Sequence, residues 1–473
     1  MAGAADRIDG PGLRRRRWLA LAAAAAALPG CALRSPPDVR ELTATELAHA
    51  PLPANWRAGG LAVEVQTGWL KSFDDPRLPP LADEALTYNA DLRIAAARVE
   101  VAAAALKAAG GAQWPELNLS GRSGGKATGS QGQLSGLVLS ASWELDLWGR
   151  VRAGKQAADA QFASAQADER AARQAIVASL AKAWFLAGET ILQKRLITDV
   201  LTASETIVRL AEDRLQLGIG TEADVALARA DLQSYRDSAL QIDLVLLQSR
   251  RALEVLLGRY PAAELDLPAG LPAMPPPAAT GVPSELLERR PDIVAAERRF
   301  AASFARVGEA RAARLPRISL SAALSSISSS VFVLQTDSDP TFGGAASVFF
   351  PIFNAGQLEA QVELRTAEQK QAGAVFAQTA LRAFNEVESA LASEVSLSAR
   401  ELVLRQGLTD SRRALELEQV RFRVGSRDLR TVTQQQLAAY AVSMSLLRVQ
   451  TEQRVQRVQL HLALGGDFAP AGS

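Results

Sequence analysis

Few residues of this 473-residue chain belong to the types that carry covalent or metal chemistry. Cys31 is the single cysteine, and His49 and His461 are the only histidines. This scarcity argues against a zinc site built from Cys and His ligands and against a Ser–His or Cys–His catalytic pair. No cluster of Asp or Glu stands out either. We therefore predict no enzymatic activity, no cofactor and no metal site.

The segment before Cys31 has the pattern of an export signal. Arg14–Arg17 form a basic region, and Trp18–Leu28 is an apolar run of signal-peptide length. This run is shorter than the about 20 residues of an ordinary membrane-spanning helix. No later stretch approaches such a helix, so we expect any further membrane crossing to use β-strands.

The chemistry expected at Cys31 is lipidation. Leu28-Pro29-Gly30-Cys31 resembles the lipobox of bacterial lipoproteins, although Pro29 departs from the usual small or β-branched residue. We predict a signal peptide over residues 1–30 and a lipid on Cys31, the first residue of the mature chain. Ala32, in place of an aspartate, fits sorting to the outer membrane. A plain signal peptide followed by an incidental cysteine is the alternative.

The overall composition favours long helices and gives no sign of a nucleic-acid partner. Lys and Arg total 52 and Asp and Glu total 51, for a net charge of +1. Nucleic-acid binding needs a clustered basic excess, so we predict no such partner. Aromatic residues make up only 5% of the chain, and alanine is abundant. Alanine loses no side-chain entropy when it becomes helical, which favours helices.

The sequence contains one unit twice. Matching motifs recur at an offset of 201 residues before the predicted strands and of 207 residues after them. The pairs are Asp91 with Asp292, Pro115 with Pro316, Gly218 with Gly425, and Gly258 with Gly465. We predict repeats over 81–267 and 284–466, joined by a proline-rich linker over 268–283. Residues 31–80 precede the repeats, and a tail over 467–473 follows them.

Each repeat contains two short segments of alternating polarity, which predict strands. They lie at 116–120, 137–145, 318–325 and 344–352, with glycine- and serine-rich loops expected at 123–132 and 328–341. Runs of about ten residues suit tilted membrane-spanning strands, although a soluble hairpin buried in a core would alternate as well. Four strands are too few for a membrane barrel, so spanning would require several chains. Three chains would supply about twelve strands.

Each strand pair precedes a helical hairpin. Proline-free stretches over 150–217 and 357–424 predict helices about 100 Å long, which are stable only when packed along their length. After a glycine turn, each return helix carries an apolar stripe with the coiled-coil repeat. One stripe runs from Val225 to Leu256, and the other runs from Val432 to Ala463 with polar members such as Gln453. We interpret the polar members as suited to a wall with water on one side.

Three motifs carry a resemblance to a known family. They are Leu287–Ile293 (Leu-Glu-Arg-Arg-Pro-Asp-Ile), Ala141–Arg150 and Pro351–Gly356. With the duplication, they resemble the TolC-like outer membrane factor family, in particular its NodT-type lipoprotein branch serving resistance-nodulation-division (RND) efflux systems. The resemblance implies a mostly α, internally duplicated fold. It also implies four transmembrane strands per chain, which join a trimeric β-barrel above a long α-helical barrel.

This resemblance also implies a function, a location and partners. The chain would be the outer-membrane exit duct of a tripartite efflux pump, conducting small solutes or drugs to the cell exterior. It would be lipid-anchored in the outer membrane and extend into the periplasm, with residues 31–80 as anchor and equatorial segment. The implied partners are two further copies of the chain, a periplasmic adaptor (membrane fusion) protein, an inner-membrane RND transporter and outer-membrane lipid.

The resemblance assigns two sites to the helical hairpins. The adaptor-contacting tips would be the turns, with Arg214, Gly218, Gly220, Thr221, Arg421, Gly425, Arg427 and Asp428. The periplasmic mouth would involve Arg430, Thr431 and Gln434. Relatives commonly place an aspartate where this chain has Gln434, so we expect no acidic ring there, and Asp428 with Arg430 could form another latch. The alternative is that the tip residues only shape their turns.

Two other classes of protein compete with this interpretation. An exported periplasmic coiled-coil adaptor or scaffold would also be rich in helix, but it predicts fewer amphipathic strands and no duplicated strand pair with a hairpin. An exported enzyme such as a glycosidase would need a globular alternation of strands and helices, which the sequence lacks. Neither the cargo nor the partner pump follows from the sequence.

Overall fold

The computed structural model describes residues 35–61, 63–65, 67–125, 133–329 and 341–468. The predicted signal peptide, Cys31 and the end of the C-terminal tail lie outside these ranges. The chain divides into two compact units. The sheet unit comprises Met1–Leu42, Val101–Ala163 and Arg298–Ala374, and the hairpin unit comprises Thr43–Glu100, Ser164–Glu297 and Val375–Ser473.

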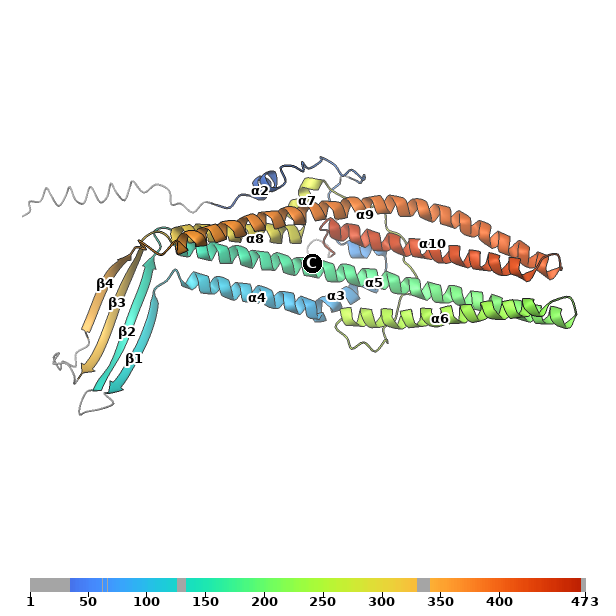
Figure 1. Ribbon diagram of the computed structural model, residues 1–473, viewed down its shortest axis with the longest axis horizontal. Coiled ribbons are helices and arrows are strands. Elements are labelled where there is room, and N and C mark those ends of the chain that lie inside the picture. The colour runs from blue at the N-terminus through green and yellow to red at the C-terminus, as the bar shows by residue number, and fades with distance from the viewer. Residues whose placement is uncertain (1–34, 62, 66, 126–132, 330–340, 469–473) are drawn as a thin grey trace, which may run out of the picture. The chain divides into compact units, whose positions relative to one another are not determined.

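The element order repeats, as the duplication predicted (Figure 1). The first copy runs α4 (Ala90–Gly111), β1 (Glu116–Gly125), β2 (Gln133–Leu145), α5 (Arg150–Gln216) and α6 (Glu222–Leu256). The second runs α8 (Pro291–Ala312), β3 (Arg317–Ser329), β4 (Thr341–Phe349), α9 (Gln357–Arg423) and α10 (Leu429–Ala463). Corresponding helices have equal lengths of 22, 67 and 35 residues. The predicted internally duplicated, mostly helical fold is confirmed.

The four strands form one antiparallel sheet in the order β1-β2-β3-β4, and Figure 1 shows them side by side. Both loops between paired strands begin later in the structure than the sequence predicted. Gly125 still pairs with Gln133, and Ser328 still pairs with Ser135, because ladder pairing outweighs the low strand propensity of Gly and Ser. The fourth strand also ends at Phe349, not at 352 as expected, because Pro351 lacks the N–H that would continue the ladder.

A compact elbow joins β2 to α5 within the sheet unit. Asp146 caps the helix, since its carboxylate accepts hydrogen bonds from the N–H groups of Val151 (3.0 Å) and Arg152 (2.8 Å). Arg150 returns to Glu144 of β2 through two hydrogen bonds of 3.0 and 2.8 Å. Gly149 has a φ of +76°, which glycine adopts without strain. These contacts explain the Ala141–Arg150 motif.

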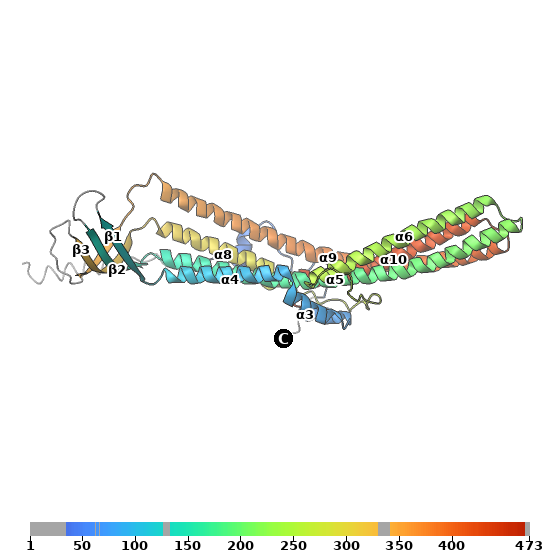
Figure 2. The same cartoon turned by 90° about the horizontal axis from the view of Figure 1, so that it is seen from below.

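The hairpin unit has its core where η1 (Trp69–Phe73) and α3 (Leu78–Tyr88) pack against α5. Two further short helices are α2 (Val39–Glu46) and α7 (Pro283–Arg289). Trp184 and Phe185 of α5 are fully buried against Phe73, Leu78 and Leu253. Figure 2 shows α3 next to α5. Such packing along its length is what stabilises a 67-residue helix.

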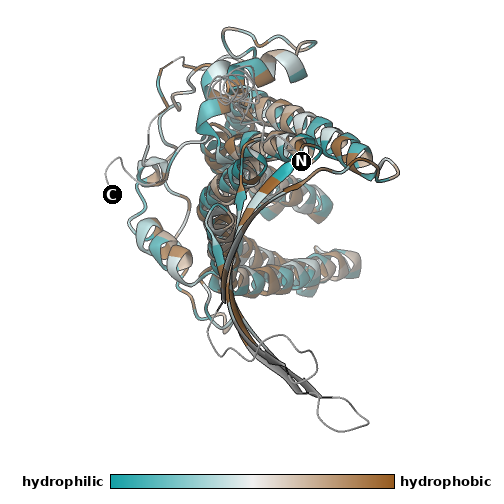
Figure 3. Cartoon of the chain, turned by 90° about the vertical axis from the view of Figure 1, so that its left-hand side faces the viewer, coloured by the Kyte–Doolittle hydropathy of each residue, from teal (hydrophilic) through white to brown (hydrophobic). Residues whose placement is uncertain are grey.

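The predicted apolar stripes are buried. Val225, Leu232, Ile242 and Leu253 of α6 are all in the core of the hairpin unit. In the second copy the polar member Gln453 is buried too, and its amide donates to Glu401 of α9 at 3.0 Å. The interpretation that such polar residues suit a wetted wall is therefore wrong for Gln453. Figure 3 shows hydrophilic and hydrophobic residues mixed along the helices.

One helix corrects the expectation that no stretch after the signal approaches a membrane span. By length and composition alone, α5 contains an 18-residue window apolar enough to cross a bilayer. More than half of that window is buried inside the chain, because it packs in the core around Trp184. Apolar composition in this helix reflects protein core, and a single such helix is weak evidence of a span.

Candidate functional site

The sheet has one apolar and one polar face. Its register aligns Leu119, Leu139, Leu324 and Phe342 in one row across all four strands. Residues that pair directly across strands point to the same face, so this row is apolar from edge to edge. A second row, Glu116, Ser142, Ser321 and Ala345, lies on the opposite face. The period-two patterns of the four segments thus combine into a single amphipathic surface.

The apolar face is exposed within the chain. Leu119 is 70% exposed, Leu117 67% and Phe342 79%, whereas a soluble hairpin would bury such side chains in a core. This observation removes the alternative of a buried soluble hairpin. One face of the sheet thus presents hydrocarbon to its surroundings, and the opposite face presents serine hydroxyls.

Aromatic side chains gather where the strands meet the helices, a feature the sequence analysis missed. Trp114 is 74% exposed just before β1, and Phe349 and Phe353 are 63% and 88% exposed at the end of β4. Trp143 donates its indole N–H to the carbonyl of Gln113 at 3.0 Å. Aromatic girdles of this kind mark the interface between membrane and water in outer-membrane strands. Exposed tryptophan beside an alternating segment was the available signal.

The first hairpin tip is a helix-ending glycine turn. The N–H of Ile219 donates to the carbonyl of Arg214, and the N–H of Gly218 donates to that of Leu215, both at 3.0 Å. This is the Schellman arrangement, with Gly218 at a φ of +72°. At Gly220 an added Cβ would lie 2.9 Å from the backbone nitrogen of Leu215, so only glycine fits.

Thr221 caps the return helix α6. Its hydroxyl oxygen accepts the N–H of Asp224 at 3.1 Å, and the Asp224 carboxylate accepts the N–H of Thr221 at 3.1 Å. Together these bonds form a capping box. Thr221 thus has a structural role at the tip.

The second tip repeats the turn with a different cap. Gly425, at a φ of +79°, donates to the carbonyl of Phe422 at 3.0 Å. Asp428 caps α10, because its carboxylate accepts the N–H (3.1 Å) and the hydroxyl (2.7 Å) of Thr431. The hydrogen bonds from Thr431 hold the pKa of Asp428 below its usual value. Asp428 was expected at the tip and Thr431 at the mouth, and the cap that they form was not predicted.

Arg214 brings the two tips together. Its guanidinium donates to the carbonyl of Phe422 at 3.0 Å and lies 4.8 Å from the centre of the Phe422 ring. The corresponding Arg421 instead pairs with Glu418 at 2.7 Å on its own helix, and Arg427 lies 3.7 Å from the same carboxylate. The duplicated arginines therefore differ, since only Arg214 joins one hairpin to the other.

The predicted mouth residues lie in the first turns of α10. Arg430 and Gln434 are exposed, and Thr431 is half-buried. Gln436, two residues beyond Gln434, is buried and donates to the hydroxyl of Ser204 on α5 at 3.0 Å. Gln434 thus remains available to line a passage, while Gln436 fixes α10 against α5.

Buried arginines hold the linker and the most specific motif. Arg290 of the Leu287–Ile293 motif donates to Asp292 (2.9 and 2.8 Å), to Glu386 of α9 (2.6 Å) and to the carbonyl of Ala463 (3.2 Å). Arg457 of α10 pairs with Glu394 and donates to carbonyls of the proline-rich linker. Arg454, one turn earlier, also donates to a carbonyl of this linker. A sequence alone does not distinguish such buried arginines from solvated ones.

The described part of the chain contains no group of three or more His, Cys, Asp or Glu that could hold a metal ion. The arrangement found instead is an amphipathic sheet in the sheet unit and paired hairpin tips in the hairpin unit.

Comparisons with known proteins agree with this architecture. The family model described as outer membrane efflux protein matches residues 81–259 and 282–466. The chain is 28% identical to the cation efflux system protein CusC of Escherichia coli O6:H1, over 94% of this chain and 97% of the relative. It is 30% identical to the pyoverdine export outer membrane protein OpmQ of Pseudomonas putida, over 96% and 98% of the two chains. The solved structure of the outer-membrane channel OprN superposes with a TM-score of 0.81 at 28% identity, covering 89% of this chain and 98% of that one.

Proposed function

Because this chain belongs to the outer membrane efflux protein family, we propose that three copies of it form the exit duct of a tripartite efflux pump. The chain is an outer-membrane efflux channel, and this function replaces the alternative of a periplasmic adaptor. The family consists of channels, not enzymes. The relatives' names mention cations and pyoverdine, so small solutes are the proposed cargo.

The exposed apolar face of the sheet is the observation that carries this proposal. The row from Leu119 to Phe342 would meet lipid, and the serine-rich face would line a wet passage. Each outer strand, β1 and β4, has a single strand neighbour among the described residues. An unpaired strand edge in lipid would cost several kcal/mol per backbone group, so the edges must be covered. Other copies of the chain would cover them and close a barrel.

Exposed apolar side chains on the long helices support the same assembly. Leu240 of α6 is 70% exposed, and Leu402 and Val403 of α9 are 72% and 70% exposed. These residues would be buried between neighbouring copies in a helical barrel. The trimer, its adaptor and its inner-membrane transporter are proposals.

The finer assignments of the sites are proposals as well. Cys31 would carry the lipid that adds an anchor in the outer membrane. The tip residues would contact a periplasmic adaptor, with the apolar Ile219 and Val424 at the two turns, 62% and 74% exposed, offering a surface for it. Residues 268–283 would join the two repeats at the equatorial belt.

A matched pair of substitutions tests the spanning sheet. Leu139→Arg places a charge on the apolar face near the middle of β2, where it should cost about 2–4 kcal/mol in a bilayer. Ser140→Arg places the same charge on the polar face and should cost little. We expect the first variant to lose outer-membrane trimers and conductance in planar bilayers, and the second to keep both. Equal behaviour of the two variants would reject the assigned faces.

A further inference from the structure

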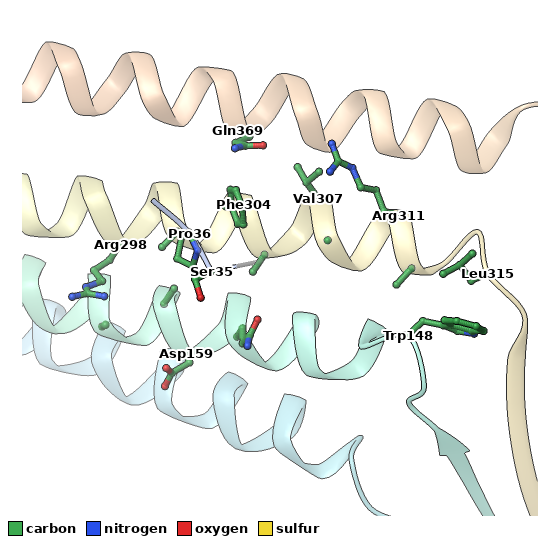
Figure 4. A pocket seen from close by; sticks show the side chains of 17 residues that line it. Ser35, Pro36, Trp148, Asp159, Arg298, Phe304, Val307, Arg311, Leu315 and Gln369 are labelled. Atoms are coloured by element: carbon green, nitrogen blue, oxygen red, sulfur yellow. The ribbon is translucent and has the colours of Figure 1, made fainter. Parts of the chain in front are cut away.

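A small cavity lies in the hairpin unit between α5, α6 and α10. Its volume is about 10 Å³, which is room for about one water-sized particle. The groove between α5 and α8 in Figure 4 is different, since it is wide, about 710 Å³ in volume, and lined by arginine and apolar side chains. The polar side chains that line the small cavity all offer oxygen atoms, and they belong to Ser204, Asp231, Tyr235, Thr433 and Gln436. Among the described residues, no lysine, arginine or histidine lines it.

The spacing of these five residues explains why they meet at one place. Asp231 and Tyr235 are four positions apart on α6, and Thr433 and Gln436 are three positions apart on α10. Residues three or four positions apart share a helix face, so each pair reaches the cavity from one side. Ser204 of α5, which is 4% exposed, supplies the third side.

Asp231 carries a negative charge that nothing in the described chain compensates. Its half-buried side chain has no hydrogen bond or ion pair among the described residues. The arginines that flank it on α6 are engaged elsewhere, because Arg229 pairs with Glu212 at 2.6 Å and Arg236 pairs with Glu205 at 3.4 Å. Burial raises the pKa of Asp231. A charge held away from water is normally paired with an opposite charge or with a metal ion.

The other oxygen atoms are suited to accept a cation. The Tyr235 side chain is buried, yet its hydroxyl has no hydrogen bond among the described residues, whereas buried tyrosine hydroxyls usually have a partner. Thr433 donates its hydroxyl proton to the carbonyl of Arg430 at 3.0 Å, which leaves its lone pairs. The amide nitrogen of Gln436 donates to Ser204 at 3.0 Å, which leaves its carbonyl oxygen. A water molecule could bond to these oxygens, but it would not compensate the neighbouring carboxylate.

We propose that this cavity binds one monovalent cation of the size of sodium beside the carboxylate of Asp231. Hydroxyl and amide oxygens from α5, α6 and α10 would complete its coordination, since oxygen atoms are the ligands that hard cations prefer. One carboxylate balances a single positive charge, and a divalent ion would leave a positive charge in excess. The site thus differs from a cluster of three or more acidic, histidine or cysteine ligands, of which the described residues contain none.

A cation at this position would join the two helical hairpins. α5 and α6 form the first hairpin, and α10 belongs to the second. Tyr235 and Tyr440 also meet here edge to face, with ring centres 6.0 Å apart. Asp231 lies about 15 Å along α6 from Thr221 at the tip. Loss of the ion would leave an uncompensated carboxylate between the hairpins, so they should separate more readily. The site lies within one chain and does not depend on the proposed trimer.

Thermal unfolding of the full-length protein in detergent tests the site. The parent is compared in sodium chloride and in N-methylglucamine chloride at equal ionic strength. Sodium should raise the midpoint by about 2 °C with a saturating dependence on concentration, because the ion binds only the folded chain. Asp231→Asn should lose this shift, and Asp237→Asn, at an exposed carboxylate of the same helix, should keep it.

Three results would overturn the proposal. A parent that does not distinguish sodium from N-methylglucamine would show that the cavity holds only water. A sodium shift retained in Asp231→Asn would place the ion elsewhere. A larger shift with magnesium than with sodium at equal ionic strength would reject a monovalent ligand.

Crystals of the parent soaked in a thallium(I) salt give a measurement that needs no variant. Thallium(I) is a monovalent cation, and its anomalous X-ray scattering marks its position. We expect one anomalous peak per chain between Ser204, Asp231 and Gln436, and we expect added sodium to weaken it at least about twofold. Peaks only at other places would overturn the proposal, even if Asp231→Asn failed to fold.

Discussion

At the residue scale, Arg290 is buried between two carboxylates and a helix-ending carbonyl. Burial alone would raise the pKa of Asp292, but the hydrogen bond and charge of Arg290 lower it below its usual value. Arg290→Ala would leave both carboxylates without their partner, which we expect to cost about 3 kcal/mol in unfolding free energy. The unfolding free energy of Arg290→Lys should lie between those of the parent and Arg290→Ala, because lysine keeps the charge but lacks the planar guanidinium.

The neighbouring Arg289 provides the control for this prediction. It pairs with Glu285 at 3.6 Å in the preceding turn of α7 and is more exposed than Arg290. Arg289→Ala should therefore change the unfolding free energy by less than about 1 kcal/mol. Thermal unfolding of the purified protein in detergent compares the variants, and similar losses for Arg289→Ala and Arg290→Ala would contradict the assigned role.

A buried histidine gives the molecule a predictable response to acid. His461 stacks on Trp69 at a centroid distance of 5.6 Å, and burial together with the positive charge of Arg457 lowers its pKa to about 4. Between pH 6.5 and 4 the unfolded chain therefore binds more protons than the folded chain, so stability falls as the pH falls. The full loss would be about 3 kcal/mol.

Denaturant unfolding at several pH values measures this response. His461→Phe keeps an aromatic ring for Trp69 and removes the titrating group, so its stability should vary less between pH 6.5 and 4. Carboxylates with depressed pKa values, such as Asp292, lose their contribution only below the usual carboxylate pKa of about 4. An unchanged pH slope in His461→Phe would show that another group is responsible.

At the scale of elements, different residues of the hairpin tips form the turns and are available to contact a partner. Gly218 and Gly425 have positive φ, so substituting either one strains its turn and cannot report docking alone. Ile219 and Val424 expose their side chains at these turns and make no side-chain hydrogen bond that shapes them. Ile219→Asp with Val424→Asp should weaken adaptor crosslinking and efflux several-fold without lowering trimer yield. Tyr260→Asp, at a side chain 85% exposed in a loop, is the control. Normal crosslinking in the double variant would argue that the tips only shape the hairpins.

Pattern and spacing predicted the helices and the duplication because both depend on local periodicity. The helical hairpins follow from proline-free stretches and from the glycine turns at Gly218 and Gly425. The ends of β1 and β3 did not follow, because their Gly and Ser residues gain strand structure from partners far along the chain. The clamp of Arg457 on the proline-rich linker, about 180 residues away, also depends on a tertiary contact that no local pattern encodes.

The same distinction between local patterns and tertiary contacts applies to the candidate sites. The cap at Thr221 can be predicted from the sequence because a cap needs only nearby residues, here Asp224 three positions later. Asp428 has the same local signal with Thr431, yet its charge led to an interpretation as a latch. The contact between the two tips through Arg214 and Phe422 could not be predicted, because Arg421 occupies the corresponding position in the second repeat and makes a different contact.

At the scale of the whole molecule, function depends on groups that one chain leaves unpartnered. The apolar face around Leu139, the outer strands β1 and β4, and the exposed Leu402 and Val403 of α9 would all be costly in a solitary chain in contact with water. Lipid can cover the apolar face. In the proposed duct, only further copies of the chain can cover the outer strands and the exposed side chains of α9. Assembly and membrane insertion should therefore fail together.

The last prediction concerns the proposed mouth, where a trimer would place three copies of one side chain around a passage. Gln434 is exposed and uncharged, so Gln434→Asp would add three negative charges if it lines that passage. Single-channel recording should then find a several-fold higher preference for cations than in the parent, because a ring of carboxylates selects cations. The effect should be largest in dilute salt, since the screening length falls from about 10 Å at 0.1 M to about 3 Å at 1 M. Gln248→Asp, at an exposed glutamine of α6 far along the hairpin from the turn, controls for net charge. An unchanged ion preference in Gln434→Asp would place this residue outside the constriction and turn attention to Arg430.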